Sequence, residues 1–187
     1  KQKNKIIIYG KGLNSLQKPS NDIYLGNSGT GARLLTGLLS SQEFETTLIG
    51  DKSLSSRPMN RIVNPLKKMN AEIETKKGRM PLLIKGKKLS SASIEIDIPS
   101  AQIKSGILLA ALNTKGTTNV TEKNITRDHT EIMLQAFGAD ILVESNDNKK
   151  LIKINGEKEL KSQNINVPSD LSSSSFFIVA ALINKKS

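Results

Sequence analysis

The chain has 187 residues and a formal net charge of +11, since 28 lysine and arginine residues outnumber 17 aspartate and glutamate residues. With no cysteine and one histidine, it excludes disulfides, thiolate nucleophiles, cysteine-bound zinc and a histidine-rich metal site. No apolar run approaches the roughly 20 residues of a membrane span, so we expect no membrane partner. The length predicts one domain. Because the sequence starts at Lys1 and stops just after the apolar run 176–183, we expect a piece of a longer protein.

The basic charge is compatible with a nucleic-acid surface, a site for a small anion, or a solvated face. Two tyrosines and four phenylalanines are too few for the stacking platforms of a single-strand binding site, so we expect no nucleic-acid partner. The lysine-rich runs are instead expected at hairpin tips and on exposed strand faces: Lys76, Lys77, Arg79, Lys85, Lys87, Lys88, Lys149, Lys150 and Lys153.

A pattern of about 70 residues recurs along the chain. Its first part is a short apolar strand closed by glycine and a charged residue, at 5–16, 81–89 and 151–160. An alternating strand follows each time, starting at Asp22, Ser93 and Asn164. A short apolar helix then begins in a stretch rich in glycine or serine, giving helices over 28–39, 100–112 and 169–182.

The second part of the pattern occurs twice. Strands are predicted from Thr46 and Thr118, and helices follow the arginines at 57 and 127. Asn70 and Gly138 close those helices, as residues that tolerate a left-handed backbone.

The predicted fold is therefore an α/β fold whose unit is strand, helix, strand, helix, strand, strand. The helices are apolar on most sides whereas the strands alternate, so we expect buried helices and outer sheets. The chain divides into the end of a first unit at 1–21, whole units at 22–91 and 93–161, and a final strand and helix at 163–187.

The stretch LGNSGTGARLL, from Leu25, joins a strand to a helix. Its three glycines let backbone N–H groups approach a ligand at a helix N-terminus, which suits a phosphate or carboxylate. A tight strand-to-helix turn explains the same glycines. The equivalent corner, PSAQIKS from Pro99, offers the Ser100 hydroxyl and the Gln102 amide, and a simply capped helix is the other interpretation.

Arginines occupy matching corners of the two units. Arg57 and Arg127 each stand just before a predicted helix, where a cation opposes the helix dipole, so bound anions would compensate them. A surface pair between Arg127 and Asp128 is the alternative. His129 is expected to be a first-turn residue rather than a catalyst, and Arg33 can be structural.

Five motifs in order, LGNSGTGARLL, SSRP, PSAQIKSGILLAAL, TRDHTEIMLQAFGA and VPSDLSSSSFFIVAAL, resemble the 5-enolpyruvylshikimate-3-phosphate synthases. The resemblance covers essentially the whole chain. It implies the inside-out enolpyruvyl transferase fold of two similar domains, of which this chain resembles most of the N-terminal-side one. It also implies transfer of the enolpyruvyl group of phosphoenolpyruvate to the 5-hydroxyl of shikimate 3-phosphate, with release of phosphate.

The resemblance further implies roles for individual residues. Phosphoenolpyruvate would be bound by Gly29, Arg57, Gln102, Asn27 and Thr30, and shikimate 3-phosphate by Ser100, Ala101, Gln102 and Arg127. The acid–base residues of the family match nothing in this chain, so the fragment is expected to be inactive alone. Leu34, Ala101 and Arg127 differ from a large branch of the family, so glyphosate sensitivity is left open.

The remaining implications are no metal or organic cofactor, a cytoplasmic location, and a monomer once the second domain is present. Two other hypotheses remain at this point: the related transferase that acts on UDP-N-acetylglucosamine, and a basic nucleic-acid module like the RNA phosphate cyclases. The absence of cysteine counts against the first, since that enzyme usually carries a cysteine loop in this half.

Overall fold

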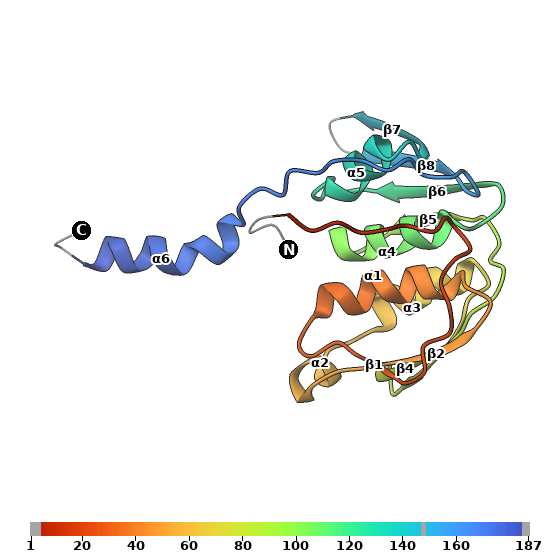
Figure 1. Cartoon of the computed structure of the whole chain (residues 1–187), viewed down its shortest axis with the longest axis horizontal. Helices are drawn as coiled ribbons and strands as arrows, with labels where there is room; N and C mark the ends of the chain where they lie inside the picture. Colours follow the sequence, from red (N-terminus) through yellow and green to blue (C-terminus); the bar gives the residue numbers. More distant parts are fainter. Residues whose placement is uncertain (1–4, 147–148, 185–187) are drawn as a thin grey trace.

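Strands with apolar residues at every second position build two four-stranded sheets on either side of a layer of helices (Figure 1). The structure is a computed structural model and describes residues 5–146 and 149–184. The first sheet has the order β1 (Ile23–Tyr24), β2 (Glu45–Ile49), β4 (Arg79–Lys85) and β3 (Glu72–Lys76). The second has the order β5 (Ser93–Ile96), β6 (Thr117–Glu122), β8 (Lys149–Asn155) and β7 (Asp140–Asn146).

The two sheets have the same topology. In each, the first two strands are parallel and the other pairs are antiparallel. The registers correspond as well, since Leu48 pairs with Leu82 in one sheet and Val120 with Ile152 in the other. All four side chains are fully buried, so each sheet turns an apolar face to the helices.

Two helices lie between the sheets and pack against each other: α1 (Gly29–Ser40) and α4 (Ala101–Ala111) (Figure 1). Ser28 and Ser100 cap their N-termini through their hydroxyls. The other helices are α2 (Lys52–Ser56), α3 (Asn60–Lys68), α5 (His129–Ala136) and α6 (Leu171–Ile183). Backbone φ angles of +67° at Asn70 and +79° at Gly138 confirm the predicted left-handed ends of α3 and α5.

The predicted α/β fold class, with buried helices and outer sheets, is confirmed, and α2 is an additional short helix that the repeat did not predict. Asp51 caps α2 by accepting a hydrogen bond from the Leu54 backbone N–H at 2.7 Å. Arg57 therefore stands at the end of α2 rather than at the first turn of α3. The division into units at 1–21, 22–91, 93–161 and 163–187 stays a prediction.

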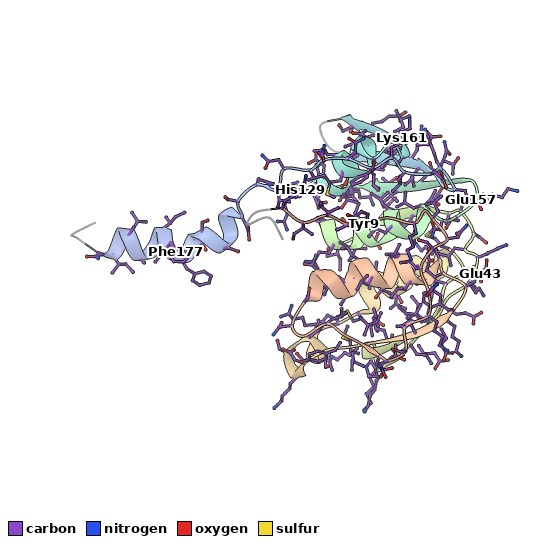
Figure 2. All side chains as sticks on the ribbon, viewed as in Figure 1. Tyr9, Glu43, His129, Glu157, Lys161 and Phe177 are labelled. Carbon is purple, nitrogen blue, oxygen red and sulfur yellow. The ribbon has the colours of Figure 1, made fainter. Side chains whose placement is uncertain are left out.

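Four expectations were wrong. Residues 5–16 and the segment from Asn164 to the start of α6 form no strand, because neither has a partner strand to complete a ladder. The apolar helix α6 is not buried: it projects from the sheets, and Phe177 is 79% exposed (Figures 1 and 2). Lys150, expected on a solvated strand face, is only 5% exposed because it turns toward the buried carboxylate of Glu131.

Candidate functional site

The turn from β1 into α1 forms the first corner of the site. Gly26 takes a φ of +55°, a conformation that favours glycine, and redirects the chain into the helix. The Ser28 hydroxyl accepts a hydrogen bond from the Gly31 N–H at 3.0 Å, which fixes the first helical turn. Gly29 is buried at this point, whereas Thr30 is exposed.

The equivalent turn from β5 into α4 forms the second corner. The Ser100 hydroxyl accepts from the Ile103 N–H at 3.4 Å, a long cap bond that leaves the hydroxyl at the rim. This corner opens onto a pocket of about 580 Å³. Its walls come from both repeats and are Arg33, Arg61, Pro99, Ser100, Ala101, Gln102, Ile103, Ile125, Thr126 and Arg127.

Gln102 connects the two corners across the repeat. Its amide oxygen accepts from Arg33 Nη1 at 2.7 Å, and its amide nitrogen donates to Thr30 Oγ1 at 2.8 Å. These two partners fix the orientation of the Gln102 amide. If the amide were flipped, its NH2 group would face the N–H groups of Arg33, and two donors cannot form a hydrogen bond. The start of α1 and the start of α4 are therefore held as one surface.

Gly29 lies against two guanidinium groups. A Cβ added to it would come within 2.9 Å of Arg57 Nη1 and 3.0 Å of Arg33 Nη1. Arg33 Nη1 also donates to the Gly29 carbonyl at 3.2 Å, and Arg57 Nη2 donates to Asn27 Oδ1 at 2.5 Å. The absence of a side chain at Gly29 is what allows both cations to reach the helix start.

The site carries strong uncompensated positive charge. Arg33, Arg57, Arg61 and Arg127 form no ion pair with a carboxylate within residues 5–146 and 149–184. Burial lowers the pKa of Arg33, and the neighbouring charges of Arg57 and Arg61 lower that pKa further. An arrangement of repelling guanidinium groups beside two helix N-termini is suited to a ligand with several negative charges.

The predicted site residues fall into two adjoining groups. Ser100, Ala101, Gln102 and Arg127 line the pocket itself. Asn27, Gly29, Thr30 and Arg57 form the neighbouring corner and join the pocket through Arg33 and Gln102.

Two alternatives from the sequence, a surface pair between Arg127 and Asp128 and a purely structural role for Arg33, lose support. Asp128 lies 3.9 Å from Lys150 Nζ, and the described residues contain no ion pair between Asp128 and Arg127. Arg33, considered structural from the sequence, lines the pocket. His129 is the first residue of α5, as predicted, and is exposed (Figure 2).

Sequence reasoning missed Arg61, which lines the same pocket. The signal was present, because Arg61 follows Arg57 by four residues within a basic stretch. It also missed Lys104, which is polar in sequence and fully buried in the structure. In the described part of the chain, no three histidine, cysteine or acidic side chains gather as metal ligands, and no helix has the length and apolarity to cross a membrane.

The whole chain, residues 1–187, matches the family model of EPSP synthase (3-phosphoshikimate 1-carboxyvinyltransferase). It is 50% identical over 182 residues to the 3-phosphoshikimate 1-carboxyvinyltransferase of Ruthia magnifica, which covers 97% of this chain and 41% of that protein. The Streptococcus uberis enzyme is 48% identical over 182 residues, covering 96% and 42%. The chain thus spans about two fifths of the length of these relatives.

Solved structures agree with this assignment. The Acinetobacter baumannii EPSP synthase superposes with a TM-score of 0.80 at 49% identity, covering 91% of this chain and 38% of that one. The enolpyruvyl transferase NikO of Streptomyces tendae has a TM-score of 0.59 at 18% identity over 80% of this chain and 36% of its own, a likeness of fold. Because the family match extends over every residue and the two corners meet in one basic site, the chain belongs to the EPSP synthase family.

Proposed function

We propose that this chain supplies the anion-holding half of a 3-phosphoshikimate 1-carboxyvinyltransferase. In the net reaction the 5-hydroxyl oxygen of shikimate 3-phosphate forms a bond to C2 of phosphoenolpyruvate and the bond from C2 to the phosphate oxygen breaks. The proton lost by the hydroxyl ends on the released phosphate. Inorganic phosphate leaves and the enolpyruvyl ether remains. The observation that supports this most is the Arg33–Gln102–Thr30 link, which joins two helix N-termini and their arginines into one surface.

Shikimate 3-phosphate is assigned to the pocket. Its phosphate would accept hydrogen bonds from the Ser100 hydroxyl, the Ala101 backbone N–H and the Arg127 guanidinium, all of which line this space. The Gln102 amide lies at the junction, where it can contact both substrates. Charge-assisted bonds of this type contribute about 1–3 kcal/mol each.

Phosphoenolpyruvate is assigned to the adjoining corner. The Arg57 guanidinium, held by Asn27, would bind its carboxylate or phosphate, while Gly29 and Thr30 present the backbone and hydroxyl of the α1 start. The same corner suits glyphosate, an anion of similar size that also carries a carboxylate and a phosphorus oxyanion. A ring of fixed donors of this kind lowers the barrier to transfer by stabilising the negative charge that develops on the leaving phosphate.

Proton transfer is not assigned to this chain, because the walls of the pocket include no carboxylate and no histidine. We therefore expect binding without turnover from these 187 residues. A monomeric state of the longer protein and a cytoplasmic location also remain proposals.

Titration of the chain with shikimate 3-phosphate by calorimetry tests the assignment. Arg127→Gln should weaken the binding free energy by about 1–3 kcal/mol. Arg79→Gln, an exposed arginine on β4, should leave it unchanged. Equal affinity of the two variants would overturn the role of Arg127. Tight, strongly salt-dependent binding of a single-stranded oligonucleotide in place of the metabolite would overturn the function. Phosphate release from both substrates by the chain alone would refute the expected lack of turnover.

A further inference from the structure

A cluster of four charged side chains is buried directly behind the pocket. Lys104 is 0% exposed, Glu122 1%, Glu131 2% and Lys150 5%. They come from four different elements, α4, β6, α5 and β8, and their formal charges cancel. We refer to these four residues as the charge cluster.

The cluster is connected by short ion pairs. Lys104 Nζ lies 2.9 Å from Glu122 Oε2 and 2.8 Å from Glu131 Oε1. Lys150 Nζ lies 3.3 Å from the same Glu131 oxygen. Lys104 follows Gln102 by two residues on α4, so the cluster is attached to the helix that provides one wall of the pocket.

The cluster also holds the opposite wall, the loop 123–128. The Thr126 hydroxyl donates to Glu122 Oε1 at 2.5 Å, and Asp128 Oδ2 lies 3.9 Å from Lys150 Nζ. The residues on both sides of Arg127 therefore contact the cluster, whereas Arg127 itself lines the pocket. A further bond of 2.6 Å between the Ser105 and Thr130 hydroxyls ties α4 to the start of α5.

The first repeat unit shows that the fold does not require these charges. Four residues after its capping serine, α1 buries Ala32 where α4 buries Lys104. The first turn of α3 buries Ile62, and β4 buries Met80 at the strand position that corresponds to Lys150. Equivalent positions are thus apolar in one unit and ionic in the other.

Stability does not account for that difference. Desolvation of buried ion pairs costs about as much as their attraction gains, so apolar residues of similar size stabilise a core at least as well. Ion pairs and hydrogen bonds do fix direction and register, which apolar contacts do not. The second unit differs from the first in having to present Arg127 from a loop rather than from the end of a helix.

We infer that the charge cluster is a positioning device that fixes loop 123–128 and thereby directs Arg127 into the pocket. None of its four members is among the residues that line the pocket. They act through Thr126 and Asp128, on either side of Arg127. The inference that the cluster orders loop 123–128 does not depend on the proposed function. Only the expected effect on shikimate 3-phosphate affinity rests on it.

Two variants test the inference without leaving a buried charge alone. Thr126→Val removes the hydroxyl that donates to Glu122 and preserves shape. The double variant Lys104→Met with Glu122→Met removes one charge of each sign together with the oxygen that accepts from Thr126, and it keeps the Lys150–Glu131 pair. Thr121→Val on β6 is the control for the loss of a hydroxyl. Backbone nitrogen-15 order parameters over 123–128 and the unfolding midpoint are measured for each chain.

The order parameters of 123–128 should fall from about 0.85 toward about 0.6 in both variants, while those of the core strands β6 and β8 stay as in the parent. Side-chain nitrogen resonances distinguish local from general damage: inorganic phosphate should shift the Arg127 signal less in the variants and the Arg57 signal as in the parent. Affinity for shikimate 3-phosphate should fall about tenfold.

Unchanged order parameters of 123–128 in both variants would overturn the inference. Equal weakening of the Arg57 and Arg127 responses would overturn it too, since a positioning role is local. If the parent chain binds neither phosphate nor shikimate 3-phosphate, the proposed function fails, but a fall in the loop's order parameters in the variants still supports its ordering by the cluster.

Discussion

Gly37 of α1 and Gly106 of α4 face each other so closely that a Cβ on Gly37 would lie 1.8 Å from the Gly106 carbonyl oxygen. No real Cβ tolerates this distance, so the two buried helices approach each other backbone to backbone. The contact lies one turn along α1 from Arg33 and one turn along α4 from Gln102, the residues that join the two corners of the site. The closeness of the helices therefore sets the distance that the Arg33–Gln102 hydrogen bond spans.

Gly37→Ala should lower the free energy of unfolding by about 2 kcal/mol or more, because the methyl group meets backbone that cannot rotate away. Urea denaturation measures the change. Gly10→Ala is the control, since a Cβ there has nothing within 4 Å, and it should change stability by less than about 0.5 kcal/mol. If Gly37→Ala and Gly10→Ala were equally stable, α1 and α4 would have to lie further apart than the Gly37–Gly106 contact indicates.

Gly29→Ala should affect binding rather than folding. The added Cβ meets the ends of two flexible side chains, Arg57 and Arg33, which can move at little cost. Displaced guanidinium groups should weaken phosphoenolpyruvate binding about tenfold, as for one charge-assisted contact. Calorimetric titration with phosphoenolpyruvate measures this change.

Gly31→Ala, two residues further on, gives the opposite result. Its Cβ would lie 2.8 Å from the Ser28 hydroxyl that caps α1, so it should cost about 1 kcal/mol of stability. Binding should change less than in Gly29→Ala because the guanidinium groups are untouched. If Gly29→Ala instead lost stability and bound phosphoenolpyruvate as before, the expectations for its folding and for its binding would both be contradicted.

Arg61→Gln should stabilise the chain in the absence of ligand and weaken its binding of phosphate. Burial and, after it, repulsion by Arg57 and Arg61 lower the pKa of Arg33 in the folded state, so this cation costs stability wherever it is charged, including neutral pH. Removing one neighbour should raise the free energy of unfolding by a few tenths of a kcal/mol, because solvent screens exposed charges.

The effect of Arg61→Gln should disappear at high salt, where the parent chain gains stability of its own through screening. Thermal unfolding at low and high ionic strength, with and without phosphate, provides the measurement. Arg79→Gln is the matched control on an exposed strand. Destabilisation by Arg61→Gln at low salt would show that Arg61 has a stabilising partner instead.

Glu95→Gln should have an effect that depends on pH. A hydrogen bond from Lys123 and its charge lower the pKa of Glu95 below its ordinary 4.5. The pair therefore contributes stability above that value, and the contribution is lost as pH falls through the lowered pKa. The unfolding midpoints of the parent and variant should differ at neutral pH and low salt and converge in acid. A difference that persists in acid would assign the effect to packing.

The sequence by itself determined the repeat, the order of strands and helices within the two whole units apart from α2, and the capped corners. These depend on local signals: alternation of period two, apolar runs, capping serines and residues that accept a positive φ. It also placed Ser100 and Gln102 at one corner, because strand-to-helix turns can be recognised from a few neighbouring residues. Arg127 was predicted at a separate corner, and only the folded chain brings it to the same pocket.

Only the tertiary structure decided which residues from distant segments contact each other. The bond from Arg33 to Gln102 spans 69 positions, and Lys104 is buried because carboxylates from β6 and α5 surround it. Local patterns also predicted a strand at 5–16 and a buried helix α6, and neither is observed. A strand forms only beside a partner strand, and an apolar helix is buried only where another element covers it. Whether a face is covered is a property of the other elements, which periodicity within one segment does not contain.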